Sequence, residues 1–172
     1  MKTKIIILSV VFALVSTISF GQKNSVEEAN NVISKFKEKD AGISKFFDTA
    51  YGYAVFPSIG KGGFVVGGAG GKGTLYKGGS EVADVKMTQV TVGAQVGGQK
   101  YSEVIFFKNA AAYDEFVKGT FKMAAQISAV ALAEGVSTDA AYQDGILVFT
   151  MSIGGLMAEV SAGGQKFTVE MY

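Results

Sequence analysis

Glycine is concentrated in the middle of this chain, where 14 of its 23 glycines lie between Gly52 and Gly98. That density argues against helix, because each glycine costs about 1 kcal/mol relative to alanine in a helix interior. Valine, phenylalanine and tyrosine alternate with the glycines, which distinguishes the segment from a disordered linker. Glycines inside strands mark bulges, tight curvature or close approach of another backbone. The pattern therefore predicts a small, strongly curved, barrel-like antiparallel β-sheet.

The first glycine-containing segments have the spacing of strands joined by tight turns. Tyr53–Phe56 predicts a strand that ends at Pro57, the only proline in the chain, because proline has no N–H to donate to a neighbouring strand. Gly62–Gly68 and Thr74–Tyr76 predict two more strands. Lys77–Ser80 contains two glycines and is typical of a hairpin turn.

A longer alternating segment follows at residues 87–99. Val90 and Val92 lie on its apolar side, and Met87 and Gln89 lie on the other. A period of two with one apolar side predicts a half-buried strand. Residues 122–133 also alternate and are interpreted as a strand, although their alanine content favours helix. Other strands are predicted over Glu103–Phe107, centrally in the sheet, and over Gly145–Ser152, Leu156–Ser161 and Lys166–Met171.

Residues 1–21 have the three-part layout of a secretory signal peptide. Two lysines precede an uncharged apolar run of 16 residues, and Ser19 and Gly21 place small residues where a signal peptidase reads them. A membrane span needs roughly 20 residues, so an uncleaved anchor is the weaker alternative. We expect cleavage after Gly21 and a mature chain that begins at Gln22. The protein is therefore expected to be exported, either periplasmic or secreted, and peripheral if it contacts a membrane.

The mature chain opens with a predicted helix. Ser25 and Glu28 form a capping box, and apolar residues recur at helical spacing between Val26 and Phe36. Gly42 is expected to cap the C-terminus of this helix. The helix is predicted to cover one face of the sheet. An alternative is that it lies on a membrane surface, with its lysines beside the apolar stripe.

Two further helices complete the prediction. One spans residues 43–50 and turns Phe46 and Phe47 inward, and Asn109 caps another over residues 110–118. The expected fold class is thus α+β, in which an N-terminal helix pair and one further helix pack on the curved sheet. Residues 22–172 are expected to form a single domain, with a core of roughly residues 30–171.

The composition excludes several kinds of site. The chain has no cysteine, histidine, tryptophan or arginine, so its 16 basic residues are all lysines. It therefore has no thiolate nucleophile, no Ser-His-Asp triad and no Cys/His zinc site, and we expect neither a metal nor another cofactor. After signal cleavage, 14 lysines face 15 acids, a net charge of −1. Nucleic-acid-binding domains are usually strongly basic, so no nucleic-acid partner is expected.

Five motifs in order resemble the SYLF lipid-binding family, over roughly residues 30–170. The first is YAVFPSIGKGGFVVGG, in which an apolar strand and a Phe-Pro-Ser turn precede a glycine-rich strand. The others are similar to that family's next turn and strand, its Gly-x-Gln-x-Gly strand, its strand–helix junction and its last glycine-led strand. They lie at Gly70–Tyr76, Thr91–Gln99, Phe106–Gly119 and Gly155–Val160.

The resemblance implies a domain that binds membrane lipid, with phosphoinositides as ligands of its eukaryotic members, some of which also bundle actin. Val82–Val85 stands where those members have a Trp-x-x-Pro segment, and the chain carries no appended SH3 module. These departures argue against actin as a partner. Export argues for an anionic lipid other than phosphoinositide, because a compartment outside the cytosol offers other headgroups.

Charge is divided unevenly along the chain. Residues 61–108 contain six lysines and three acids, for a net of +3, whereas residues 109–172 contain three lysines and seven acids, for a net of −4. A lysine patch near glycine turns would attract anionic headgroups, although scattered lysines on a solvated face would give the same count. The lysines predicted to bind lipid are Lys61, Lys72, Lys77, Lys86 and Lys100.

The sequence argues against a dinucleotide site and against hydrolysis by paired carboxylates. Residues 68–73 match G-x-G-x-x-G, but strand and turn residues follow where a dinucleotide site needs a helix. Hydrolysis by paired carboxylates needs a cleft that holds two acids close together. The candidate acids sit at expected helix starts and turns: Asp114, Glu115, Glu134, Asp139 and Asp144.

The sequence thus favours a non-enzymatic lipid-binding module. The alternative is a structural or protein-interaction domain of the cell envelope, which exposed glycine-rich strand edges would suit.

Overall fold

The computed structural model describes residues 25–63, 66–92, 98–119, 129–154 and 164–172. The predicted signal peptide lies outside the described residues. A helix over residues 25–39, called the N-terminal helix below, comes first. The elements that follow are η1 (Ala41–Ile43), α2 (Ser44–Thr49), β1 (Gly52–Gly63), β2 (Val66–Lys77), β3 (Ser80–Val92), β4 (Gln99–Phe107), α3 (Ala110–Val117), β5 (Val130–Ala131), η2 (Val136–Thr138), β6 (Ile146–Ser152) and β7 (Gln165–Met171).

The fold is α+β, as predicted. Seven strands form one sheet in the order β5-β6-β4-β1-β2-β3-β7. Neighbouring strands are antiparallel except β5 and β6, which are parallel and so correct the expectation of a purely antiparallel sheet. The hairpin turn between β2 and β3 is confirmed, with Gly78 and Gly79 both at positive φ. Gly68–Gly73 lies within β2 and does not open a helix, as expected.

The sheet is strongly curved. Gln165 of β7 donates a hydrogen bond from Nε2 to Oε2 of Glu103 on β4 at 3.0 Å, although β1, β2 and β3 lie between these strands. In a flat sheet, four strand spacings would separate β4 from β7 by about 19 Å. The face that carries Glu103 and Gln165 is therefore concave, and the opposite face is convex.

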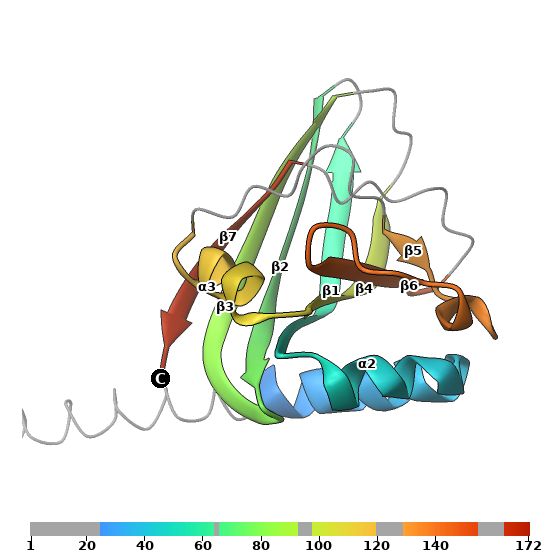
Figure 1. The fold of residues 1–172 in the computed structure, drawn as a ribbon. Helices are drawn as coiled ribbons and strands as arrows, with labels where there is room; N and C mark the ends of the chain where they lie inside the picture. The colour runs from blue at the N-terminus through green and yellow to red at the C-terminus, as the bar shows by residue number, and fades with distance from the viewer. Residues whose placement is uncertain (1–24, 64–65, 93–97, 120–128, 155–163) are drawn as a thin grey trace, which may run out of the picture.

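Helices cover both faces. On the concave face, Phe116 of α3 packs against Phe107 and Phe167, with ring centroids 4.7 and 4.8 Å apart. On the convex face, the N-terminal helix and α2 lie together across one end of the sheet (Figure 1). Phe47 of α2 meets Phe106 there, with ring centroids 4.8 Å apart. The predicted helix pair on one sheet face, and the inward Phe46 and Phe47, are confirmed.

The predicted cap at Gly42 is wrong. Gly42 lies inside η1 and has no positive φ. The N-terminal helix ends before Asp40, which is the N-cap of η1: its carboxylate accepts hydrogen bonds from the backbone N–H of Gly42 at 3.0 Å and of Ser137 at 2.8 Å. The third helix is as predicted: Asn109 caps α3 by accepting a hydrogen bond from the N–H of Ala112 at 3.0 Å.

Pro57 does not end the first strand, contrary to the prediction. β1 continues to Gly63 through a bulge between Val55 and Ser58. The bulge removes Pro57 from the hydrogen-bonding ladder, and its carbonyl accepts a hydrogen bond from the Ser102 hydroxyl at 2.7 Å. A bulge is one of the few places where a sheet interior tolerates proline.

The inward side of β3 is the reverse of the predicted one. Met87 and Gln89 face the concave core and are buried, whereas Val90 is 76% exposed. Met87 pairs with Phe167 of β7, and both are buried in the concave core, so the sheet curves around this side of β3 and leaves Val90 outside. The strands predicted at β4, β6 and β7 are confirmed. Those over residues 122–133 and 156–161 lie mostly or wholly outside the described residues; β5 is the described part of the first.

Candidate functional site

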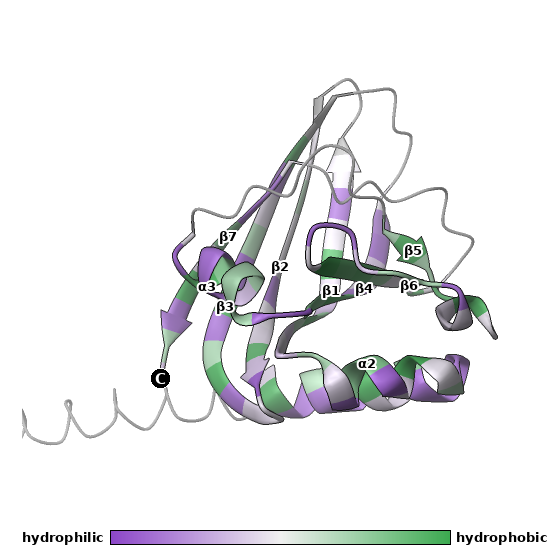
Figure 2. Ribbon diagram, in the orientation of Figure 1, coloured by the Kyte–Doolittle hydropathy of each residue, from purple (hydrophilic) through white to green (hydrophobic). Residues whose placement is uncertain are grey.

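The convex face has a covered half and an open half. Near Val55 the N-terminal helix and α2 cover it, but beyond the Pro57 bulge its side chains face solvent. We call this open half the glycine–lysine face. Figure 2 shows the corresponding end of β1 as mostly pale, because the glycines there have intermediate hydropathy. The face comprises Ser58, Gly60, Gly62, Gly68, Gly70, Lys72, Lys86, Thr88, Val90, Lys100, Lys166 and Thr168.

Strand register aligns these residues in rows. One row runs across five strands, from Lys100 on β4 through Gly60, Gly70 and Thr88 to Lys166 on β7. Residues paired directly across antiparallel strands point to the same side of a sheet. The row therefore has a lysine at each end, and the floor between them is formed by two glycines and the short side chain of Thr88.

The glycines of this floor are not required by packing. A Cβ built on Gly60 or Gly62 would meet nothing within 4 Å, and one on Gly70 would come no closer than 3.5 Å to a neighbouring carbonyl oxygen. Glycine weakens a strand, so three exposed glycines and the partly exposed Gly62 on one patch cost stability without a steric reason. An open floor instead suits something that approaches the backbone closely.

Gly73 has the opposite surroundings. It points toward the concave side, where the β1 bulge presses against it, and an added Cβ would lie 2.4 Å from the carbonyl oxygen of Val55 and 2.7 Å from Cδ1 of Phe56. The glycines of β2 therefore serve two purposes: those facing the concave core allow close packing, and those facing outward leave a surface bare.

Three of the five predicted lysines share this face. Lys72, Lys86 and Lys100 are exposed, and Lys72 pairs directly with Lys86 across β2 and β3. Like charges directly opposite each other repel, which an anion between them would relieve. Among the described residues, none forms an ion pair with these lysines. The nearest acids in register are Asp84 and Glu170, which point to the same side of the sheet in the next row beyond Lys86 and Thr168. Asp84 accepts a hydrogen bond from the Tyr172 hydroxyl at 2.9 Å.

Two predicted lysines lie elsewhere. Lys61 occupies a position on β1 whose register assigns it to the concave side. Lys77 stands at the far end of the sheet, with its ammonium 5.1 Å from the ring centroid of Tyr51 and 5.3 Å from that of Tyr113. A hydrogen bond to Tyr51, together with electrostatic attraction to the phenolic oxygen of that residue, raises the pKa of Lys77. Lys77 thus joins the β2–β3 hairpin to α3 rather than to the glycine–lysine face.

Sequence reasoning missed Lys166. Lys166 lies far along the chain from the glycine-rich segment, and it joins the face only because β7 pairs with β3. No local pattern in the sequence contains that long-range pairing. The alternation of Lys166, Thr168 and Glu170 was the available signal, since it puts all three on one side of a strand.

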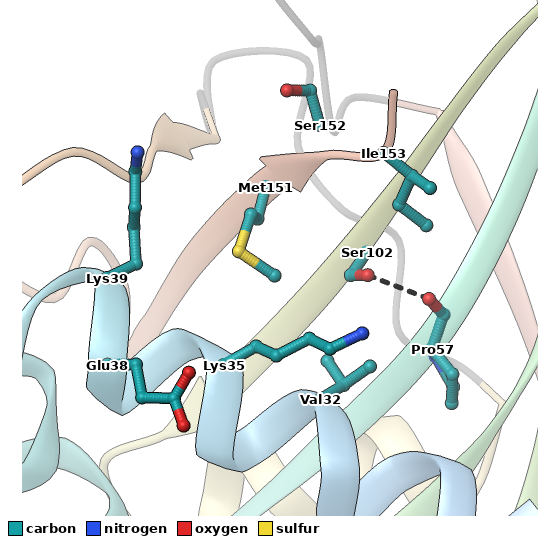
Figure 3. A pocket seen from close by; sticks show the side chains of 9 residues that line it. All are labelled: Val32, Lys35, Glu38, Lys39, Pro57, Ser102, Met151, Ser152 and Ile153. Carbon is teal, nitrogen blue, oxygen red and sulfur yellow. Dashed lines mark hydrogen bonds between the residues drawn. The ribbon is translucent and has the colours of Figure 1, made fainter. Parts of the chain in front are cut away.

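Two hollows adjoin the glycine–lysine face. The larger, of about 450 Å³, lies between the N-terminal helix and the sheet at the Pro57 bulge (Figure 3). The second, of about 420 Å³, lies over the ends of β1 and β4 and shares Ile153 with the first. The first is lined by Val32, Lys35, Glu38, Lys39, Pro57, Ser102, Met151, Ser152 and Ile153, and the second by Gly60, Lys61, Gly98, Gln99, Lys100 and Ile153.

The concave core holds a buried polar cluster that the sequence did not reveal. Glu103 is fully buried, and burial raises its pKa to about 7, while the hydrogen bond from Gln165 works in the opposite direction. Burial and the nearby Glu103 also raise the pKa of Tyr101. Oε1 of Glu103, Oε1 of Gln165 and the hydroxyl of Thr150 have no hydrogen-bond partner among the residues that the structure describes. The carboxyl is thus held in surroundings that favour its neutral form.

The acids considered for hydrolysis do not join this cluster. Asp114 and Glu115 are exposed on α3, and Glu134, Asp139 and Asp144 are exposed in the connections before β6. Within the described ranges, no three acidic side chains gather in a metal-binding arrangement. Over the same ranges, the helices are too short or too polar to cross a bilayer.

Comparison with known proteins adds one relative. No family model matches the chain. Beta cell expansion factor A of Aeromonas veronii is 25% identical over 142 residues, which make up 83% of this chain and 54% of that protein. The chain therefore spans about half the length of this relative, and the relative's name specifies no ligand.

Proposed function

We propose that this chain is a non-enzymatic module that binds anionic headgroups at a membrane surface through its glycine–lysine face. The observation that carries the proposal is the row from Lys100 to Lys166, in which lysines border exposed glycines that packing does not require. The resemblance to the SYLF family supports the same function. The predicted signal peptide supports an exported, peripheral protein that meets lipid outside the cytosol.

The chemistry of the face fits a headgroup layer better than a discrete phosphate site. Lysine attracts anions as a point charge and lacks the bidentate fork of arginine, so lysines spread over four strands suit many headgroups at once. Each lysine near an anionic membrane contributes about 1 kcal/mol, and the attraction weakens as salt rises. The low floor lets the lipid surface approach the sheet, and exposed Val90 would contact its apolar edge.

Reversing two neighbouring charges tests the proposal. In Lys72→Glu/Lys86→Glu we expect binding to anionic vesicles to fall roughly thirtyfold, because about 2 kcal/mol of attraction is lost. Co-sedimentation of the mature chain from Gln22 with phosphatidylglycerol-containing vesicles measures this. The matched control is Lys108→Glu/Lys118→Glu, which makes the same change in net charge at exposed positions on either side of α3. Equal losses in both variants would reduce the proposal to net charge alone. No loss in either would direct attention to a protein partner in the envelope.

A further inference from the structure

The two hollows beside the glycine–lysine face form a candidate binding site of their own. The first lies on the convex side, and the second lies over the ends of β1 and β4, where Gly60 and Lys100 point to the convex side and Lys61 and Gln99 to the concave side. Both are lined by Ile153, which is 44% exposed and whose backbone N–H donates to the carbonyl of Lys100 at 2.9 Å. Volumes of about 450 and 420 Å³ are in the range of small-molecule sites. Gly60 and Lys100 belong to both the second hollow and the glycine–lysine face, so the site is continuous with the proposed membrane-binding surface.

The walls of the larger hollow are mainly apolar. Val32 comes from the N-terminal helix, Pro57 from the β1 bulge, and Met151 and Ile153 from the end of β6 (Figure 3). Met151 is half-buried, and its unbranched thioether adapts to varied apolar shapes. These apolar walls suit a hydrocarbon chain.

Lysines surround the apolar walls. Lys35 and Lys39 stand four residues apart on the N-terminal helix, and the Lys35 side chain reaches across the hollow toward Pro57 and Ser102 (Figure 3). Lys100 stands at the other end, in the second hollow. The one acid in either lining is Glu38. An occupant with an apolar chain and an anionic head complements both the walls and the charges.

We infer that the joined hollows bind a single acyl chain of an anionic membrane lipid, with its headgroup between Lys35 and Lys100. This inference rests on the proposed function, since it places one lipid molecule of the bound membrane in a defined site. The chain lies against Val32, Met151 and Ile153, and the remaining lysines of the glycine–lysine face contact neighbouring headgroups.

Titration calorimetry of the mature chain with dodecyl phosphate, below the concentration at which it forms micelles, tests the inference. We expect saturable binding of one molecule per chain and about tenfold weaker binding of dodecylphosphocholine, whose head has no net charge. Inorganic phosphate should not compete. Ile153→Glu should weaken dodecyl phosphate binding at least about tenfold, since it places a charge among the apolar walls. Met171→Glu makes the same kind of change at a 57% exposed residue outside the hollows and should leave binding intact.

Three outcomes would overturn the inference: competition by inorganic phosphate, unchanged binding in Ile153→Glu, or equal losses in Ile153→Glu and Met171→Glu. Vesicle co-sedimentation separates this failure from that of the proposed function. If the wild-type chain binds anionic vesicles but takes up no dodecyl phosphate, the site is wrong and the proposed function stands. If it binds neither, both are wrong.

Discussion

Gly73→Ala should destabilise the domain by about 3 kcal/mol, the upper end of the usual cost of overpacking. Its new Cβ would lie 2.4 Å from the Val55 carbonyl oxygen, and this neighbour is backbone held in the β1 bulge. Because a flexible side chain cannot move aside here, the sheet itself must shift. Urea denaturation followed by circular dichroism measures the change in the free energy of unfolding.

Gly60→Ala is the matched control. It makes the same substitution in the neighbouring strand, at a position where a Cβ meets nothing within 4 Å and φ is not positive. We expect stability to be unchanged or to rise by up to about 1 kcal/mol, because alanine loses less backbone entropy than glycine. Equal destabilisation by both substitutions would contradict the claim that packing requires the inward glycines and not the glycine–lysine face.

Glu103→Gln should raise stability in alkaline solution and leave it nearly unchanged in acid. Burial raises the pKa of Glu103 from 4.5 to about 7, so the folded protein holds a proton that the unfolded chain releases. The wild type therefore loses stability as pH rises from about 4.5 to about 7, and the loss is complete above that window. A difference of this size in pKa corresponds to about 3 kcal/mol at pH 8.

The neutral carboxyl also completes a local hydrogen-bonding pair. Gln165 Nε2 already donates to Oε2 of Glu103, and within the described part of the chain Oε1 of each residue has no partner. A protonated Glu103 can donate from Oε1 to the Gln165 carbonyl oxygen, and a glutamine at this position can do the same through its amide. Both forms satisfy atoms that the carboxylate leaves unpaired.

Denaturation curves at pH 5, 6, 7 and 8 for the wild type and Glu103→Gln measure this effect. The difference between the two proteins isolates Glu103 from other titrating groups. Glu81→Gln, at an exposed position after the β2–β3 turn, serves as the control and should follow the wild type at every pH. Parallel pH profiles for the wild type and Glu103→Gln would show that Glu103 is ionised at no unusual cost.

Local sequence patterns predicted many elements of this fold, but the strand predicted over Gly62–Gly68 is wrong, because its first residues end β1 and its last begin β2, and Thr74–Tyr76 is part of β2 and not a separate strand. The turn at Gly78 and Gly79, the Asn109 cap and the inward Phe46 and Phe47 each depend on residues close together in the chain. Such features follow from backbone conformation and local hydrogen bonds, which a single segment contains.

The errors concern features that depend on distant segments. The alternation in β3 predicts a buried Val90, because the strand's own sequence shows only which of its two sides is more apolar. Which side faces inward is decided by curvature, and curvature brings β7 toward β4 across three intervening strands. The prediction that Pro57 ends its strand is wrong for the same reason. The bulge that accommodates this proline is supported by a hydrogen bond from Ser102, 45 residues away, which the local sequence does not reveal.

The candidate site was predicted in part for the same reason. Lys72, Lys86 and Lys100 were found because they lie in the glycine-rich segment itself. The grouping of Lys77 with them is wrong, because no local pattern places the rings of Tyr51 and Tyr113 beside its ammonium. Lys166 and the hollows near Ile153 depend on the arrangement of β6, β7 and the N-terminal helix around the sheet.

The most direct test of the central claim is co-sedimentation of the mature wild-type chain with phosphatidylcholine vesicles and with phosphatidylglycerol-containing vesicles, at low and at high salt. We predict that the chain sediments with the anionic vesicles at low salt, that high salt releases most of it, and that it stays in solution with the neutral vesicles. Failure to sediment with anionic vesicles at low salt would contradict the proposed function. Equal binding to both kinds of vesicle would contradict the role of the glycine–lysine face.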